Sequence, residues 1–207
     1  MAGSHARSGG RVAWRHALRQ PAQACEDALS DRRLIMSLAQ GGWRKAREQI
    51  ILTGQTDTGK TWHACAFAHQ AARIDKSVAY ARMPRLFDEM ATARLVGRLP
   101  RLIDKRVRVQ LLVLDDWGTH CLTGQQRLDL PELFEERYQR RSTLLTAQLP
   151  VPGWHQKIGE PTIADAVLGR IIHNAHRIEL KGDSMRRKSA RPGLTRTENP
   201  EILIQVE

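Results

Sequence analysis

The stretch Ile50-Ile51-Leu52-Thr53-Gly54-Gln55-Thr56-Asp57-Thr58-Gly59-Lys60-Thr61 predicts the fold of this 207-residue chain. A short apolar run ends at a glycine, four residues intervene, and Gly-Lys-Thr opens a segment with helical periodicity. This order of strand, Gly-x-x-x-x-Gly-Lys-Thr and helix is the pattern of a P-loop. Such a loop wraps closely around a polyphosphate, so Gly54 and Gly59 leave room for backbone N–H groups to point inward. Lys60 is expected to contact the outer phosphates, and the Thr61 hydroxyl to bind Mg²⁺.

One residue of the loop conflicts with phosphate binding. Asp57 adds a negative charge to the phosphate cradle. A carboxylate 4 Å from a phosphate charge costs about 1 kcal/mol in water, and about 4 kcal/mol at an effective dielectric near 20. If Asp57 points outward, the site keeps its affinity, and if it faces the phosphates, the chemistry is lost. The loop residues and the next one are all expected to contact nucleotide: Gly54, Gln55, Thr56, Asp57, Thr58, Gly59, Lys60, Thr61 and Trp62.

Composition limits the class of protein. The formal net charge of +11 and the pI near 10.4 favour a polyanionic partner, nucleic acid before anionic membrane. The alternative is that arginine is simply the preferred surface cation. Three widely spaced cysteines without a CxxC argue against a disulfide framework or a zinc site. No apolar run approaches the roughly 20 residues that span a bilayer, so a cytoplasmic setting and no membrane partner are expected.

Strands and helices alternate along the chain, which predicts a right-handed α/β sandwich with a mainly parallel sheet. Basic residues dominate 1–23, and a helical pattern from Ala24 to Arg47 breaks at Gly41-Gly42. A helix is expected from Thr123 to Tyr138, kinked or divided at Pro131. The expected strands are Ile50–Thr53, Ser77–Ala81, Leu111–Leu114, Ser142–Ala147 and Ala175–Leu180, and the other helices Lys60–Arg73, Pro84–Gly97, Leu99–Lys105 and Thr162–Asn174.

A second motif follows the predicted third strand. Four apolar residues, Leu111 to Leu114, precede Asp115-Asp116. Asp115 would lie at the carboxyl end of a buried strand, where ligands bind in open α/β sheets, and would hold Mg²⁺ there. Asp116 would polarise the attacking water. The alternative is an acid pair that caps a helix after an ordinary buried strand.

With these two motifs, the sequence resembles the IstB-like transposition helper ATPases, a branch of the AAA+ ATPases related to DnaC-type helicase loaders. The resemblance covers about Ala24 to Lys188. It implies a three-layer AAA+ P-loop NTPase domain with a five-stranded sheet over 24–182. Composition predicts a disordered or weakly helical basic extension over 1–23 and a basic tail over 183–207. The matching stretches beyond the P-loop are Leu111–Gly118, Arg137-Tyr138, Arg141–Thr143, Thr146–Pro150, Trp154-His155, Ile158–Ala166 and Arg170–Gly182.

The resemblance also implies roles at matching positions. Gln148 corresponds to the sensor-1 position and would contact the γ-phosphate or the water. Arg170 corresponds to an arginine finger that completes a neighbouring subunit's site, so the chain is expected to form oligomers with nucleotide at their interfaces. Arg186 corresponds to a sensor-2-like position. The alternatives are a strand cap for Gln148, an ordinary surface arginine for Arg170, and one more cation of a basic tail for Arg186.

The implied function is an ATP- and Mg²⁺-dependent ATPase that binds duplex DNA and regulates a transposase. Alternatives are a DnaC-like helicase loader and a non-hydrolysing DNA-binding remnant. Three departures from the family pattern bear on this choice: Asp57 stands where the family usually has Gly, Gly169 stands where it usually has an acid, and only about fifty residues precede the loop. They favour a divergent member or a copy truncated at its N-terminus.

Overall fold

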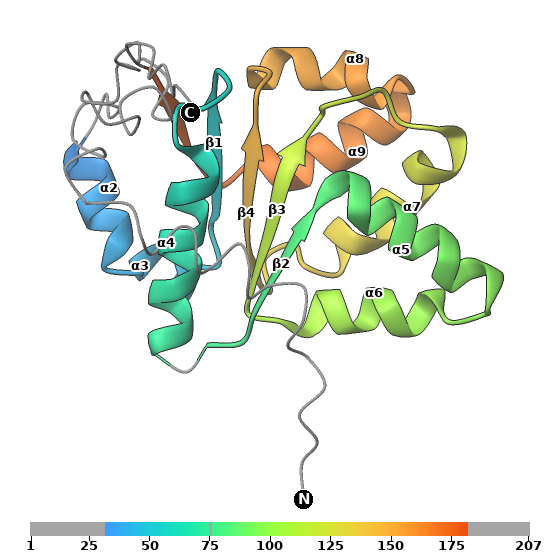
Figure 1. The fold of residues 1–207 in the computed structure, drawn as a ribbon, viewed down its shortest axis with the longest axis horizontal. Helices are drawn as coiled ribbons and strands as arrows, with labels where there is room; N and C mark the ends of the chain where they lie inside the picture. The colour runs from blue at the N-terminus through green and yellow to red at the C-terminus, as the bar shows by residue number, and fades with distance from the viewer. Residues whose placement is uncertain (1–31, 75, 182–207) are drawn as a thin grey trace, which may run out of the picture.

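A computed structural model describes residues 32–74 and 76–181 of the chain. Five strands form one sheet in the order β2-β3-β4-β1-β5, and every neighbouring pair is parallel (Figure 1). The carboxyl ends of the strands therefore share one edge of the sheet, at the top of Figure 1. The strands are β1 (Gln49–Gly54), β2 (Val78–Arg82), β3 (Leu111–Trp117), β4 (Ser142–Ala147) and β5 (Ala175–Leu180).

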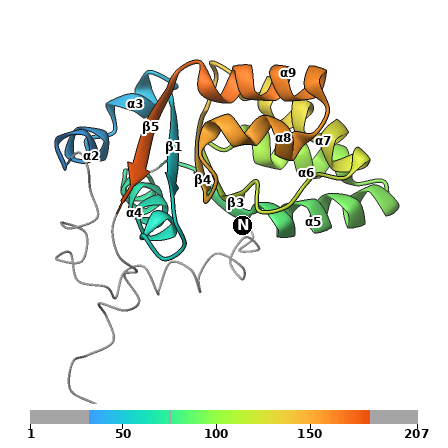
Figure 2. The same ribbon diagram turned by 90° about the horizontal axis from the view of Figure 1, so that it is seen from above.

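Helices cover both faces of the sheet. The helices form two groups, one on each side of the sheet, as the view from above shows (Figure 2). The first group is α2 (Arg32–Ala39), α3 (Gly42–Lys45) and α4 (Lys60–Arg73). The second group is α5 (Met83–Leu95), α6 (Leu99–Arg108), α7 (Gly124–Glu135), α8 (Trp154–Ile158) and α9 (Pro161–Ile172), with a short 3₁₀ turn, η2 (Val151–Gly153), before α8.

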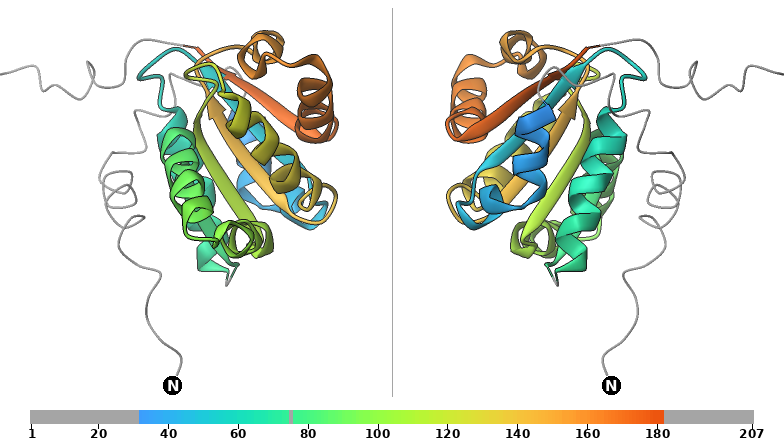
Figure 3. Two further views of the ribbon diagram at one scale, coloured as in Figure 1. Left: turned by 90° about the vertical axis from the view of Figure 1, so that its right-hand side faces the viewer. Right: turned by 90° about the vertical axis from the view of Figure 1, so that its left-hand side faces the viewer.

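Two hydrophobic cores fill the spaces between these three layers. Because successive side chains of a strand point to opposite faces, Ile50 and Leu52 pack toward α4 while Ile51 packs toward the second group of helices. The small residues of α4, such as Ala64 and Ala68, are fully buried against the sheet. On the other face, α7 and α9 pack side by side (Figure 3). The predicted three-layer sandwich is thus confirmed, and its sheet is wholly parallel.

Most predicted elements are confirmed within a few residues, and two differ at their carboxyl ends. Strand β3 includes Asp115 and Asp116, because it continues to Trp117 through an irregularity in its pairing with β4. Helix α7 ends at Glu135 and does not reach Tyr138. It is a single helix despite Pro131, and the side chains of Thr123 and Gln126 form a capping box at its start.

The predictions for 1–23 and 183–207, and for the first part of the helical region that begins at Ala24, lie outside the described residues. The break predicted at Gly41-Gly42 is confirmed, because α2 ends at Ala39 and α3 begins at Gly42. Within residues 32–74 and 76–181, no helix combines the length and apolar character needed to cross a membrane.

Candidate nucleotide-binding site

The loop between β1 and α4 has the backbone of a phosphate cradle. Gly54 and Gly59 have φ angles of 148° and 89°, which side chains disfavour. A Cβ on Gly54 would lie 2.4 Å from the carbonyl oxygen of Leu180, so the neighbouring strand leaves no room for one. Helix α4 has no side-chain N-cap. Its first N–H groups are therefore available to an anion, and the helix dipole favours one there.

Lys60 lies at the start of α4 and folds back over this loop. Its ammonium donates hydrogen bonds to the carbonyl oxygens of Gly54 (2.8 Å) and Gln55 (2.6 Å). Burial lowers the pKa of Lys60, while the charges of Asp115, Asp116 and Asp57 act in the opposite direction. The nearby carboxylates thus offset part of the cost of burying the Lys60 charge.

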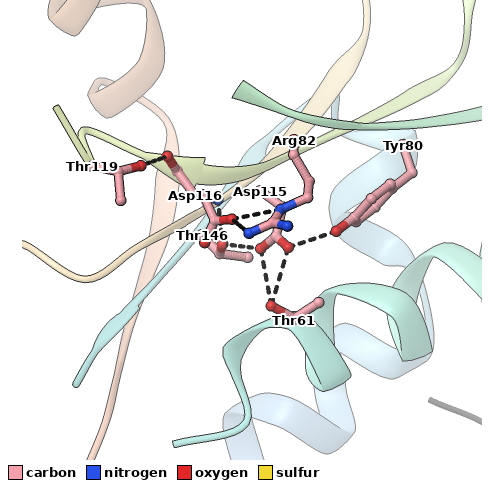
Figure 4. Close-up of polar contacts among 7 residues, drawn as sticks. All are labelled: Thr61, Tyr80, Arg82, Asp115, Asp116, Thr119 and Thr146. Carbon is pink, nitrogen blue, oxygen red and sulfur yellow. Dashed lines mark hydrogen bonds and ion pairs between the residues drawn. The ribbon is translucent and has the colours of Figure 1, made fainter. Parts of the chain in front are cut away.

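Asp115 is buried at the end of β3, and three hydroxyls converge on its carboxylate (Figure 4). Thr61 Oγ1 donates from α4 at 3.1–3.2 Å, Tyr80 Oη donates from β2 at 2.6 Å, and Thr146 Oγ1 donates from β4. Burial and the charge of Asp115 raise the pKa of Tyr80, so its phenol stays a donor. The hydroxyl and the carboxylate predicted to share a metal ion, those of Thr61 and Asp115, are therefore in contact.

Asp116 forms an ion pair with Arg82 at the end of β2 (Figure 4). Arg82 Nε donates to Oδ2 of Asp116 at 2.7 Å, and Nη2 donates to the same oxygen. Asp116 has φ of 62°, a left-handed conformation that aspartate tolerates better than most residues. Its backbone N–H donates to Thr146 Oγ1 at 3.2 Å. Thr146 thus connects both acids of the motif.

The other predicted loop and edge residues lie around this centre. Gln148 is exposed directly after β4, whose last residue, Ala147, pairs with Thr53 of β1 and Trp117 of β3. Gln148 therefore lies between the P-loop strand and the acidic strand. Gln55 and Thr56 are exposed on the loop, and Thr58 Oγ1 tightens it by donating to Gln55 O at 2.9 Å.

Asp57 and Trp62 differ from the rest of the loop. Asp57 is half-buried with φ of 64°, a conformation that glycine adopts freely and aspartate tolerates. Trp62 packs edge-on against His63, with ring centroids 5.0 Å apart. Its indole Nε1 is buried without a hydrogen-bond partner among the described residues. Trp62 lies in the first turn of α4, beside the loop in sequence, and its contact with nucleotide stays a prediction.

Arg170 does not join this site. It lies near the end of α9, on the face of the sheet opposite α4, five residues before β5 begins at the amino edge. Its guanidinium donates to Ala166 O at 2.6 Å and forms an ion pair with Glu135. A six-residue strand spans roughly 20 Å, so Arg170 is far from the P-loop of its own chain. Arg186 lies outside the described residues.

Sequence reasoning missed three residues of the site, which are Tyr80, Arg82 and Thr146. All three lie in the carboxyl-terminal halves of β2 and β4, the two strands that pair with β3, at the same edge as Asp115. Because carboxyl ends of parallel strands meet at one edge, polar residues late in two otherwise apolar strands were the available signal. Only the strand order, which periodicity does not give, brings them to Asp115.

The residues present fit Mg²⁺ and a nucleotide polyphosphate. Within the described residues no group of three His, Cys, Asp or Glu side chains is placed to hold a metal. Mg²⁺ needs no such group, because it binds through one or two protein oxygens together with phosphates and waters. Thr61 and Asp115 supply those two oxygens at the start of a helix with free N–H groups.

Comparisons with known sequences agree with this geometry. Residues 24–192 match the family described as IstB-like ATP binding protein. The insertion-sequence protein y4pL of Sinorhizobium fredii, named as an ATP-binding protein, is 52% identical over 161 residues, which are 78% of this chain and 66% of y4pL. The IS21 protein of Pseudomonas aeruginosa, also named as ATP-binding, is 27% identical over 82% of this chain and 64% of its own. The chain thus spans about two thirds of these curated relatives.

Solved structures share the fold at low sequence identity. DnaI superposes with a TM-score of 0.65 at 21% identity, covering 79% of this chain and 95% of DnaI. The replication initiator DnaA bound to AMPPCP and single-stranded DNA superposes with a TM-score of 0.60 at 19% identity, covering 77% and 49%. These likenesses show that the chain shares the fold of DnaI and DnaA. The match over residues 24–192 and the identity to y4pL show that this chain belongs to the family of IstB-like ATP-binding proteins of insertion sequences.

Proposed function

We propose that this chain is an ATP-hydrolysing helper of DNA transposition, which binds duplex DNA and regulates a transposase. The observation that carries the nucleotide part is the contact of Thr61 Oγ1 with the Asp115 carboxylate beneath the P-loop. A hydroxyl from the first turn of α4 and an acid from β3 meet where a metal on a bound polyphosphate would lie. The insertion-sequence relatives support the transposase as partner.

Each residue of the site has a defined task in this proposal. Thr61 and Asp115 would hold Mg²⁺, which neutralises phosphate charge when bound. Lys60 would exchange the Gly54 and Gln55 carbonyls for phosphate oxygens. Asp116 would orient and polarise the attacking water, and Gln148 would contact that water or the γ-phosphate from the neighbouring strand end. The ion pair with Arg82 fixes the Asp116 carboxylate at that edge.

A second subunit would complete the site. Arg170 lies toward the amino edge, on the face opposite α4, so the proposed finger acts on the nucleotide of a neighbouring copy and not on its own. A head-to-tail contact of this kind generates rings or helical filaments. Activity would then depend on self-association, with nucleotide at each interface.

Duplex DNA is the proposed polyanion. Helices α5 and α6 border an open groove lined by Arg85, Arg98, Arg101 and Lys105, with Asp88 and Glu89 at one side. Arg98, Arg101 and Lys105 are exposed, and residues 32–74 and 76–181 offer them no ion-pair partner. Free cations along a groove bind phosphates and release counterions.

The first experiment measures ATP hydrolysis with and without duplex DNA, beside Lys60→Ala. We expect DNA to stimulate the wild type and Lys60→Ala to show only background. Equal background rates in both proteins would contradict the ATPase and leave a non-hydrolysing DNA-binding remnant. A helicase loader would instead load a replicative helicase without any transposase.

The second experiment measures the salt dependence of duplex binding by the triple variant Arg98→Ala/Arg101→Ala/Lys105→Ala. Losing three phosphate contacts should make the plot of log binding constant against log salt concentration less steep, by about 3 in the magnitude of its slope. The control is Arg73→Ala/Arg140→Ala, which removes exposed arginines outside the groove. Equal slopes for both variants would place the DNA elsewhere.

A further inference from the structure

Arg170 is held by an acid from another helix. Glu135, the last residue of α7, forms an ion pair with Nη2 of Arg170 on α9, and Ala166 O accepts from Nη1 at 2.6 Å. The side chain of Arg170 is 30% exposed, and that of Glu135 is 56% exposed. The Arg170 Nε atom is buried without a partner among the described residues. The guanidinium is therefore fixed along its inner side and open on its outer side.

Glu135 and Arg170 meet because each lies near the carboxyl end of its helix, α7 or α9. Both α7 and α9 run toward the amino edge, where β4 and β5 begin, and they pack side by side (Figure 3). A glutamate at the carboxyl end of a helix interacts unfavourably with the helix dipole, whereas an arginine there interacts favourably. Glu135 therefore gains from a cation beside it. The residue before Arg170, Gly169, has no side chain to supply that carboxylate.

We infer that Glu135 is the positioning residue of the arginine that completes the neighbouring subunit's nucleotide site. The inference rests on the proposed role of Arg170 in trans. A guanidinium has five N–H hydrogens, two on each Nη atom. Ala166 O and Glu135 take one from each Nη, so one on each remains without a partner among the described residues and is available to a phosphate oxygen. Glu135 thus holds the guanidinium in place and leaves N–H hydrogens available to a ligand.

The main test compares steady-state ATP hydrolysis by the full chain carrying Glu135→Ala, Glu135→Gln or Arg170→Ala. Loss of an arginine finger lowers kcat by a factor on the order of a thousand. Loss of its positioning partner should lower kcat roughly tenfold at unchanged KM, because misplacement costs less than removal. Glu136→Ala is the matched control, since Glu136 is the adjacent acid and pairs only with Arg140 at 2.9 Å in the described part of the chain.

Mixing of subunits separates positioning from a general structural defect. A Lys60→Ala subunit keeps Glu135 and Arg170 intact and lacks its own P-loop lysine. Mixed equally with Glu135→Ala, it should raise the rate to about a quarter of wild type, because random head-to-tail assembly pairs intact halves at that frequency. Mixing Glu135→Ala with Arg170→Ala should give no recovery, because both lack a guanidinium held in place.

The position of the guanidinium is also measurable without nucleotide. Hydrogen exchange of the Arg170 Nε–H, followed by NMR in the free protein, should become about tenfold faster in Glu135→Ala and stay unchanged in Glu136→Ala. Glu135→Gln keeps the shape of the side chain, so it reports on charge even if Glu135→Ala folds poorly. Unchanged exchange in Glu135→Gln together with wild-type kcat would overturn the positioning role.

The outcomes distinguish the role of Arg170 in the intersubunit site from the role of Glu135 beside it. Full hydrolysis by Arg170→Ala would overturn the proposed intersubunit site. Inactive Arg170→Ala beside fully active Glu135→Ala and Glu135→Gln would overturn only the inference about Glu135. Faster hydrolysis by Glu135→Ala would also overturn it, because Glu135 would then be restraining Arg170 from its target.

Discussion

Two buried ions lie at opposite edges of the sheet, and neither has an oppositely charged side chain as its hydrogen-bond partner in the described part of the chain. Asp115 is 2% exposed at the carboxyl edge, and Arg137 is 1% exposed at the amino edge. Both are satisfied by neutral groups. The two ions differ in whether their hydrogen-bond partners can be exchanged for a ligand. This difference separates an edge that stabilises the fold from an edge that can bind and react.

Arg137 has a closed set of partners. Its Nη1 donates to the carbonyl oxygens of Arg106 (3.0 Å), Val107 (3.0 Å) and Val109 (2.8 Å), which tie the end of α6 to the start of β3. Nη2 donates to Ser142 O, and Nε donates to Thr143 Oγ1 at 3.1 Å. Burial and the nearby Arg141 lower its pKa to about 9, which leaves it protonated at neutral pH.

Asp115 has an open set of partners. Its donors are three hydroxyls, and the residue that supplies one of them, Thr61, is exposed at the mouth of the P-loop. A hydroxyl rotates and accepts as readily as it donates. Thr61 can therefore turn its oxygen from the carboxylate to a metal without leaving a buried group unpaired. The amino edge holds strands in place, whereas the carboxyl edge can change partners.

The largest effect is expected when the closed set is broken. Arg137→Met leaves four carbonyls and a hydroxyl without their donor, and should lower the free energy of unfolding by about 3–5 kcal/mol. Urea denaturation followed by circular dichroism measures the change. Arg140→Met is the control, because its exposed ion pair with Glu136 should contribute less than about 1 kcal/mol. Equal midpoints for the two variants would contradict the structural role of Arg137.

At the open edge, a substitution should affect activity more than stability. Asp115→Asn keeps an acceptor for the three hydroxyls and adds a donor, so unfolding should change by about 1 kcal/mol. Removing the metal-binding charge should lower ATP hydrolysis by a factor on the order of a hundred or more. Asp104→Asn removes a carboxylate from an exposed pair with Arg108 and is the matched control. If Asp115→Asn loses stability but keeps its activity per folded molecule, Asp115 is a structural residue and the contrast with Arg137 is wrong.

The two edges also differ in how much of them the sequence predicts. Periodicity and the Gly-x-x-x-x-Gly-Lys-Thr pattern predict the strands, the loop and the buried acid, because each depends on residues close together in the chain. The hydroxyls of Tyr80 and Thr146 are missed, because they reach Asp115 only through the strand order β2-β3-β4. Arg137 is missed as a buried cation, because its partners come from α6 and β4. The Glu135–Arg170 pair likewise depends on the packing of α7 against α9.

A smaller effect is expected at Asp57 on the open edge. Its charge reaches Lys60, whose pKa it raises against the effect of burial, so it also repels phosphate bound by Lys60. Asp57 is half-buried, and a water-like cost of about 1 kcal/mol corresponds to roughly fivefold in affinity. Asp57→Asn and Asp57→Gly should both tighten ATP binding by that factor, as measured by calorimetry. Tighter binding by Asp57→Gly alone would assign the effect to the backbone at φ of 64° instead of the charge.

The last effect concerns a proton at the open edge. His63 is buried one turn into α4, and its Nδ1 lies 2.9 Å from Gly59 O. Burial lowers the pKa of His63 below its ordinary value of about 6.5. Below that pH the unfolded chain binds a proton that the folded chain resists, so this group lowers stability as the pH falls. One proton changes the free energy of unfolding by at most about 1.4 kcal/mol per pH unit. Between pH 7 and 5 the wild type should lose stability relative to His63→Asn, which keeps a donor near Gly59. Parallel stability curves for the two proteins would show that His63 titrates alike in the folded and unfolded states.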